Sequence, residues 1–115
     1  MTINILGTDY TIKINNEDTR LKCDSYGFCD WTTKEIILAD DYDDDESLRL
    51  LDEFKHKVIR HEAFHALFAE MGISKWLHDE ELVEMLAMLY PKISKIMDEC
   101  DNIEIRSITH DHNEE

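Results

Sequence analysis

Apolar and polar residues alternate in the first part of the chain, which is the period of strands with one buried face. Residues 2–14 alternate on either side of the turn-forming sequence Gly7-Thr8-Asp9. Residues 26–39 alternate again, around a turn near Thr33-Lys34. We therefore expect two β-hairpins joined by a polar, irregular stretch. The run Ile36-Ile37-Leu38 in the second hairpin predicts a strand that is buried on both faces.

The period then changes to that of a helix, because apolar residues and two histidines recur at steps of three and four. This stripe consists of Leu51, Phe54, Val58, His61, His65 and Phe68. We expect the helix to run from Ser47 to Met71 and to end at Gly72, since glycine is the common residue just beyond a helix C-terminus.

A second helix is expected from Asp79 to Cys100, after a short connection, with a kink or break at Pro91. Cys100 is expected near a packed surface. Ile103 and Ile105 are expected to form a brief last strand or to cover the core. Together these elements predict an α+β fold.

Composition limits the chain to one small domain. It has 115 residues, of which 43% are hydrophobic, with one Pro and three Gly. No linker-like or low-complexity segment divides it. We assign residues 1–105 to the domain and 106–115 to a polar C-terminal tail.

The charge excludes some partners. Lys and Arg number 12 against 27 Asp and Glu, which gives a net charge of -15. Such a surface repels phosphate backbones and anionic membranes, so we expect neither nucleic-acid nor membrane binding. No N-terminal apolar block and no run of about 20 apolar residues is present. The expected compartment is therefore the cytoplasm.

Two other features have plain interpretations. Cys23, Cys29 and Cys100 are odd in number and lack CxxC spacing, so we expect free thiols in a reducing compartment. Residues 40–46, DDYDDDE, do not have the spacing of an EF-hand calcium loop. We expect a solvated loop whose last acidic residues favour the start of the following helix.

The sequence HEAFH at 61–65 carries the clearest chemistry. His61 and His65 are four residues apart, so both imidazoles project from one face of a helix and can bind one zinc ion. Glu62 projects from a neighbouring position, where it can act as general base toward a metal-held water. Both histidines interrupt an apolar stripe, where an unpaired imidazole is costly.

A third ligand is expected from the start of the second helix, which reads DEELVE at 79–84. Glu80 is the favoured ligand. Glu84, one turn later, would then accept the free N–H of a ligand histidine and fix its tautomer. Glu81 and Glu84 stay open as alternative ligands. Among several candidates for an oxyanion donor, namely His78, Tyr90, Tyr26 and His56, the sequence selects none.

With HEAFH and DEELVE in place, the sequence resembles the gluzincin branch of zinc metallopeptidases. It departs in having Glu84 where Asp is more frequent, and in lacking an Asn before the ligand. More closely, it resembles the very small phage- and prophage-encoded minigluzincin and ImmA/IrrE-type proteins. The segments that carry this likeness are Tyr26-Gly27-Phe28-Cys29-Asp30, Glu35-Ile36-Ile37-Leu38 and Val58-Ile59-Arg60.

The resemblance implies a zincin-like fold, in which a small sheet lies against the HExxH helix and its edge strand lines the cleft. It also implies one Zn²⁺, a peptide or protein substrate, and hydrolysis of peptide bonds. We expect the 26–39 hairpin to be that edge and to bind an extended peptide. Two alternatives stay open: a zincin-fold protein that binds zinc and a partner with little turnover, and an acidic inhibitor that imitates DNA. The sequence does not indicate the oligomeric state.

Overall fold

The computed structural model describes residues 1–21, 26–39 and 51–109 of the chain. Several sequence-based expectations lie outside these residues. They concern Cys23, the acidic run at 40–46, the start of the first helix at Ser47, and the last six residues of the tail.

The described residues form an α+β structure around one small mixed sheet. Its four strands are β1 (Thr2–Ile5), β2 (Thr8–Ile14), β3 (Gly27–Asp30) and β4 (Glu35–Leu38), in the order β1-β2-β4-β3. The β1–β2 and β3–β4 pairs are antiparallel, and β2 and β4 are parallel. Both predicted hairpins are confirmed, and β4 is buried on both faces as expected.

The first turn differs slightly from the prediction. It lies at Leu6 and Gly7, which both have positive φ (51° and 93°), and β2 already begins at Thr8. Two consecutive positive φ values match the twist of tight two-residue hairpins. Asn4 supports the turn, because its Oδ1 accepts a hydrogen bond from the Gly7 N–H at 3.0 Å.

Three α-helices and a short 3-10 helix follow in the described part of the chain. They are α1 (Leu51–Met71), α2 (Ser74–Leu77), α3 (Glu80–Asp101) and η1 (Ile105–Ser107). Gly72 ends α1 as predicted, with a φ of 74°. The Gly72 and Ile73 N–H groups donate to the carbonyls of Ala69 and Phe68 at 3.1 and 3.0 Å, which is the Schellman arrangement.

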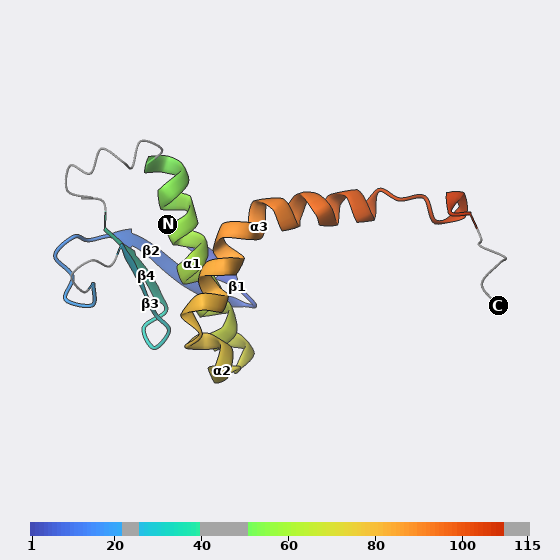
Figure 1. Ribbon diagram of the computed structural model, residues 1–115. Coiled ribbons are helices and arrows are strands. Elements are labelled where there is room, and N and C mark those ends of the chain that lie inside the picture. Colours follow the sequence, from blue (N-terminus) through green and yellow to red (C-terminus); the bar gives the residue numbers. More distant parts are fainter. Residues whose placement is uncertain (22–25, 40–50, 110–115) are drawn as a thin grey trace.

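Helix α1 lies between the sheet and α3, and two apolar clusters hold it there (Figure 1). The first cluster joins the sheet to α1 and contains Tyr10, Ile36 and Val58. The second joins α1 to α2 and α3 and contains Phe68, Leu77 and Val83. Because α1 contributes to both clusters, its position is fixed on two sides, and the stripe that carries the histidines is held between them.

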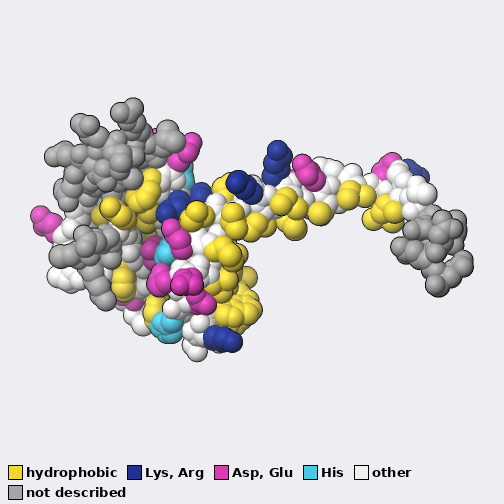
Figure 2. Space-filling view, in the orientation of Figure 1, with side chains coloured by type: hydrophobic (Ala, Val, Ile, Leu, Met, Phe, Trp, Pro, Cys, Tyr) yellow, Lys and Arg dark blue, Asp and Glu magenta, His cyan; other side chains and the backbone are white. Residues whose placement is uncertain are grey.

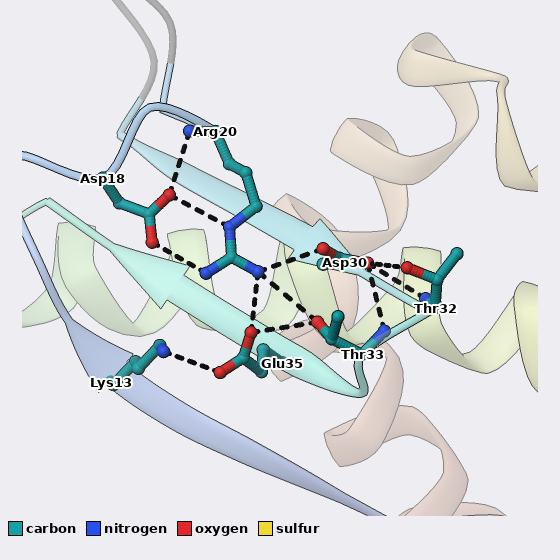
Figure 3. A network of polar contacts seen from close by, with 7 residues as sticks. All are labelled: Lys13, Asp18, Arg20, Asp30, Thr32, Thr33 and Glu35. Carbon is teal, nitrogen blue, oxygen red and sulfur yellow. Dashed lines mark hydrogen bonds and ion pairs between the residues drawn. The ribbon is translucent and has the colours of Figure 1, made fainter.

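A polar network centred on Arg20 holds the β3–β4 hairpin, which lies at the edge of the sheet opposite β1 (Figure 3). The Arg20 guanidinium donates to Asp18, Asp30 and Glu35 at distances of 2.6 to 3.0 Å. Hydrogen bonds from Arg20 lower the pKa of Asp18 to about 2. Arg20 thus joins the irregular segment after β2 to both strands of the second hairpin, a role that the sequence analysis did not anticipate.

The second half of α3 leaves the body of the protein. Figure 1 shows α3 bending part way along and projecting away, and Pro91 lies inside this helix. Val83 and Ala87 are buried, whereas every described residue from Lys95 to Thr109 is exposed. The expectations for the chain end were therefore wrong: Cys100 is exposed, and Ile103 and Ile105 neither form a strand nor cover the core.

Among the described residues, no helix combines the length and the apolar character needed to cross a bilayer.

Candidate metal centre

Three side chains from two helices converge at one point. His61 and His65 lie one turn apart on α1, and Glu80 is the first residue of α3. The Nε2 atom of His61 lies 2.9 Å from Oε2 of Glu80, and the Nε2 atom of His65 lies 3.1 Å from Oε1 of the same carboxylate. One donor atom from each of the three residues lies within 4.8 Å of the other two.

The connection between the helices sets this geometry. After Gly72 ends α1, the single turn α2 reverses the chain, and Asp79 caps the start of α3. Its Oδ1 accepts a hydrogen bond from the Leu82 N–H at 3.0 Å. Because α3 begins there and runs back along α1, its first residue faces the middle of α1, where the histidines are.

His65 has a defined tautomer. Its Nδ1 lies 2.6 Å from the carbonyl oxygen of Leu77, which can only accept a hydrogen bond, so Nδ1 carries the proton. The Nε2 atom of the neutral ring then presents a lone pair to an oxygen of Glu80. Two acceptors 3.1 Å apart repel each other unless a second proton or a cation lies between them. His65 is buried, so this pair of acceptors needs a positively charged partner between them, and a metal cation is one that fits.

His61 is oriented by a carboxylate. Its Nδ1 lies 2.9 Å from Oε1 of Glu84, and the other oxygen of Glu84 accepts from Lys57 Nζ at 2.7 Å. Burial tends to raise the pKa of Glu84, but Lys57 and His61 outweigh burial and lower it, so this group is an anion. Glu84 therefore favours a proton on Nδ1 of His61 and directs Nε2 toward Glu80.

The acidic surroundings also act on His61 itself. Burial lowers its pKa, but the contacts with Glu84 and Glu80 and the nearby Glu62 outweigh burial and raise it. Without a metal, this ring is therefore drawn toward the protonated form. A site that attracts a proton in this way attracts a metal cation for the same electrostatic reason.

Glu62 is buried beside this group, with 7% of its surface exposed. Burial raises its pKa to about 7; His61 opposes the shift, and Glu80 and Glu84 add to it. Strand β3 approaches closely here, since a Cβ atom added to Gly27 would lie 3.2 Å from Cγ of Glu62. Glycine at this position lets the strand pack directly over the carboxylate-bearing turn of α1.

A cleft of about 680 Å³ opens over the group. Its walls include His61, Glu62, His65 and Glu80 on one side and the strand residues Gly27 to Cys29 on the other. Among the described residues, β3 is the outermost strand at this side of the sheet. The 26–39 hairpin therefore lies beside the predicted ligands.

The structure brings together the residues that the sequence singled out. His61, His65 and Glu80 form the group, Glu62 and Glu84 adjoin it, and Glu81 is exposed and outside it. Of the four candidate oxyanion donors, His78 and Tyr26 line the cleft, and His56 and Tyr90 are not among its described lining residues. The described cysteines, Cys29 and Cys100, are free and outside the group.

Sequence reasoning missed two supports of the site. The Leu77 carbonyl that holds His65 is a backbone atom, so no residue type signals it. Lys57 lies one turn before His61 and pairs with Glu84, but a lysine on a helix surface has many other uses.

Comparison of the chain with protein-family models, with curated proteins and with solved structures gave no match.

Proposed function

We propose that this chain is a zinc-dependent metallopeptidase of the gluzincin group, with a zincin-like fold, that hydrolyses peptide bonds. One observation carries the proposal. The Nδ1 atoms of His61 and His65 are both occupied by acceptors, and both Nε2 atoms point at the carboxylate of Glu80. This arrangement concentrates lone pairs that a cation would satisfy.

The donor set suits zinc. Two imidazole nitrogens and one carboxylate oxygen are the three-ligand set of catalytic zinc sites, which keep a fourth position for water. Zinc–ligand bonds of about 2 Å place the donors of one ion about 3 to 4 Å apart. The atoms of His61, His65 and Glu80 are within 4.8 Å of one another, so small side-chain shifts suffice. Carboxylate partners such as Glu84 typically strengthen such sites.

In this proposal, Glu62 moves the proton. Bound zinc lowers the pKa of a coordinated water to about 7 and polarises the substrate carbonyl. Glu62 would be the residue that accepts a proton from the attacking water and returns it to the leaving amine. Its pKa is about 7 in the absence of metal, and a nearby cation would lower it, which favours the carboxylate that a base requires.

The cleft suggests how a peptide would lie. An extended peptide can add to the outer edge of β3 through backbone hydrogen bonds, which would carry its scissile bond past His61 and Glu62. Tyr26 and His78 line the same cleft and are the candidates for stabilising the oxyanion.

Metal content tests the first half of the proposal. Purified protein, dialysed and analysed for metals by mass spectrometry, should hold close to one zinc per chain. His61→Ala, His65→Ala and Glu80→Ala should each lose it. Glu81→Ala is the matched control, because Glu81 is the exposed neighbour of Glu80 and should keep the metal. Wild-type protein that binds no zinc, or a Glu81→Ala variant that alone loses it, would contradict the ligand set.

Turnover tests the second half. Glu62→Gln keeps the size of the side chain and should keep the zinc but abolish cleavage in a peptide library. If wild type and Glu62→Gln both bind zinc and neither cleaves, the protein is instead a zinc-binding protein that acts through a partner.

A further inference from the structure

The projecting part of α3 carries an apolar stripe that continues beyond the body of the protein. Apolar residues recur at alternating steps of four and three, which is the seven-residue repeat of coiled coils. The repeat comprises Leu82, Leu86, Leu89, Ile93, Ile96, Cys100 and Ile103. It spans the whole of α3 and ends just past its last residue.

The two ends of this stripe have different surroundings. Leu82 and Leu86 pack against the cluster of Phe68, Leu77 and Val83. Farther along, Ile96 and Ile103 expose 52% and 53% of their surface. Figure 2 shows hydrophobic side chains along one edge of the projecting part. We call this surface of α3, formed by Leu89, Ile93, Ile96 and Cys100, the arm stripe.

The helix itself argues for a partner. Pro91 removes one backbone hydrogen bond from α3, and the ten residues from Lys92 to Asp101 continue the same helix beyond that point. Isolated helices shorter than about 12 to 15 residues are marginal in water, and packing of an apolar face is what stabilises them. Every described residue from Lys95 onward is exposed, so no described residue covers this part of the arm stripe.

The charges beside the stripe identify the occupant. Lys92 and Glu99 are seven residues apart, so they flank the stripe on the same side at equivalent positions. In an antiparallel pair of identical helices, such equivalent positions meet, and Lys92 of each copy faces Glu99 of the other. In a parallel pair, Lys92 of one copy instead faces Met97 of the other, so the lysine gains no charged partner. Along the projecting helix, Figure 2 shows basic side chains nearer the body and an acidic one after them; beyond the helix, acidic and basic side chains lie together.

We propose that the arm stripe is a dimer interface, and that its occupant is the arm stripe of a second copy of this chain in antiparallel orientation. The stripe is apolar, it continues a surface already used for packing, and its flanking charges are self-complementary only in that orientation. The inference does not depend on the proposed metal centre, which lies on the body of the protein.

Sedimentation velocity of the full chain tests the interface between about 5 and 500 µM, which covers moderate and weak dimers. It should be run at physiological ionic strength, where repulsion between two chains of net charge -15 is screened beyond about 8 Å. The average mass of the wild-type protein should rise from that of a monomer toward that of a dimer as its concentration increases. Ile96→Glu should raise the dissociation constant at least about tenfold. Ser94→Glu adds the same charge off the stripe and should leave dimerisation unchanged.

Two charge changes test the orientation. Glu99→Lys should weaken the dimer, because it places two lysines opposite each other, and adding Lys92→Glu should restore it. All these residues lie outside the core, so each variant should still fold. Its far-ultraviolet circular dichroism should keep the helix and strand signal of the wild-type body. A wild type that stays monomeric throughout, a dimer indifferent to Ile96→Glu, or a dimer strengthened by Glu99→Lys would each overturn the proposal.

Discussion

Arg60 donates a hydrogen bond from its Nε to the carbonyl oxygen of Ala87 at 2.9 Å. Ala87 lies four residues before Pro91, so its carbonyl is the one that the missing N–H of the proline leaves without a helical partner. A side chain of α1 thus satisfies the backbone of α3 at the position where α3 bends away. The contact lies one residue before His61, so it also joins the two helices beside the candidate metal centre.

Removal of this donor should cost stability. Arg60→Met keeps an unbranched stem but leaves the Ala87 carbonyl unpaired, which should lower the free energy of unfolding by about 1 to 2 kcal/mol. Pro91→Ala restores a backbone donor for that carbonyl. In the Pro91→Ala background, Arg60→Met should therefore cost clearly less, as measured by urea unfolding of all four proteins. Equal costs in both backgrounds would show that the carbonyl is not what Arg60 stabilises.

The close approach of β3 to α1 predicts that Gly27 tolerates no side chain. A Cβ atom there would lie 2.7 Å from Cγ1 of Val58. Gly27→Ala should destabilise the protein by about 1 to 3 kcal/mol through overpacking. Val58→Ala removes the clashing methyl groups, so the double variant should be more stable than the sum of the single costs implies. Additive costs in thermal unfolding would place the strain elsewhere.

Local patterns predicted most of the fold, because the elements that they specify depend on near neighbours. Alternation specified both hairpins, and the glycine at 72 specified the end of α1. The spacing of His61 and His65 alone places them on one face of a helix. Glu80 was predicted from its position at the start of the next helix, and the short connection then determined that it faces them.

The parts that sequence reasoning missed depend on which distant atoms meet. The partner of His65 is a backbone carbonyl, and the donor to Ala87 comes from another helix. Neither has a pattern of its own. Ile103 and Ile105 were wrongly expected to form a last strand or to cover the core, because an apolar residue indicates a surface that needs cover but not whether the same chain supplies it.

The carboxylate of Glu84 should tune zinc affinity without binding zinc. It accepts from Nδ1 of His61 and is itself held by Lys57. Glu84→Ala should weaken zinc binding about 10- to 100-fold, the usual cost of losing such a partner, and leave the stoichiometry at one. Competition with a chelating dye measures this constant. Glu81→Ala is again the control and should bind like wild type; complete loss of zinc from Glu84→Ala would instead make Glu84 a ligand.

The two described cysteines should differ in reactivity. Cys29 is buried, and burial, reinforced by Glu62 and Asp30, raises the pKa of its thiol to about 12. At neutral pH it should therefore react with a disulfide reagent only when the protein unfolds. Cys100 is exposed in the monomer and should react at once when the protein is dilute enough that the arm stripe is unpaired. In a Cys23→Ser background, rapid labelling should stop on Cys100→Ser and continue on Cys29→Ser, with the thiol count followed by absorbance.

Glu70 predicts a specific acid sensitivity. Its carboxylate accepts from Lys34, Tyr10 and Thr8 at 2.6 to 2.8 Å, which joins the start of β2 and the second turn to the end of α1. These hydrogen bonds, from Lys34 first, lower the pKa of Glu70 from 4.5 to about 2. A pKa that is lower in the folded state means that the unfolded chain takes up the proton first as the pH falls.

The stability that Glu70 contributes is therefore fully present above about pH 4.5 and is lost as the pH falls toward about 2. Glu70→Gln should be less stable than wild type at neutral pH, and the difference should shrink through that window. Urea midpoints of both proteins across the window measure it. Glu17→Gln, a change at an exposed glutamate, should track wild type at every pH. A constant difference between wild type and Glu70→Gln would mean that the size and shape of the side chain matter there, and its charge does not.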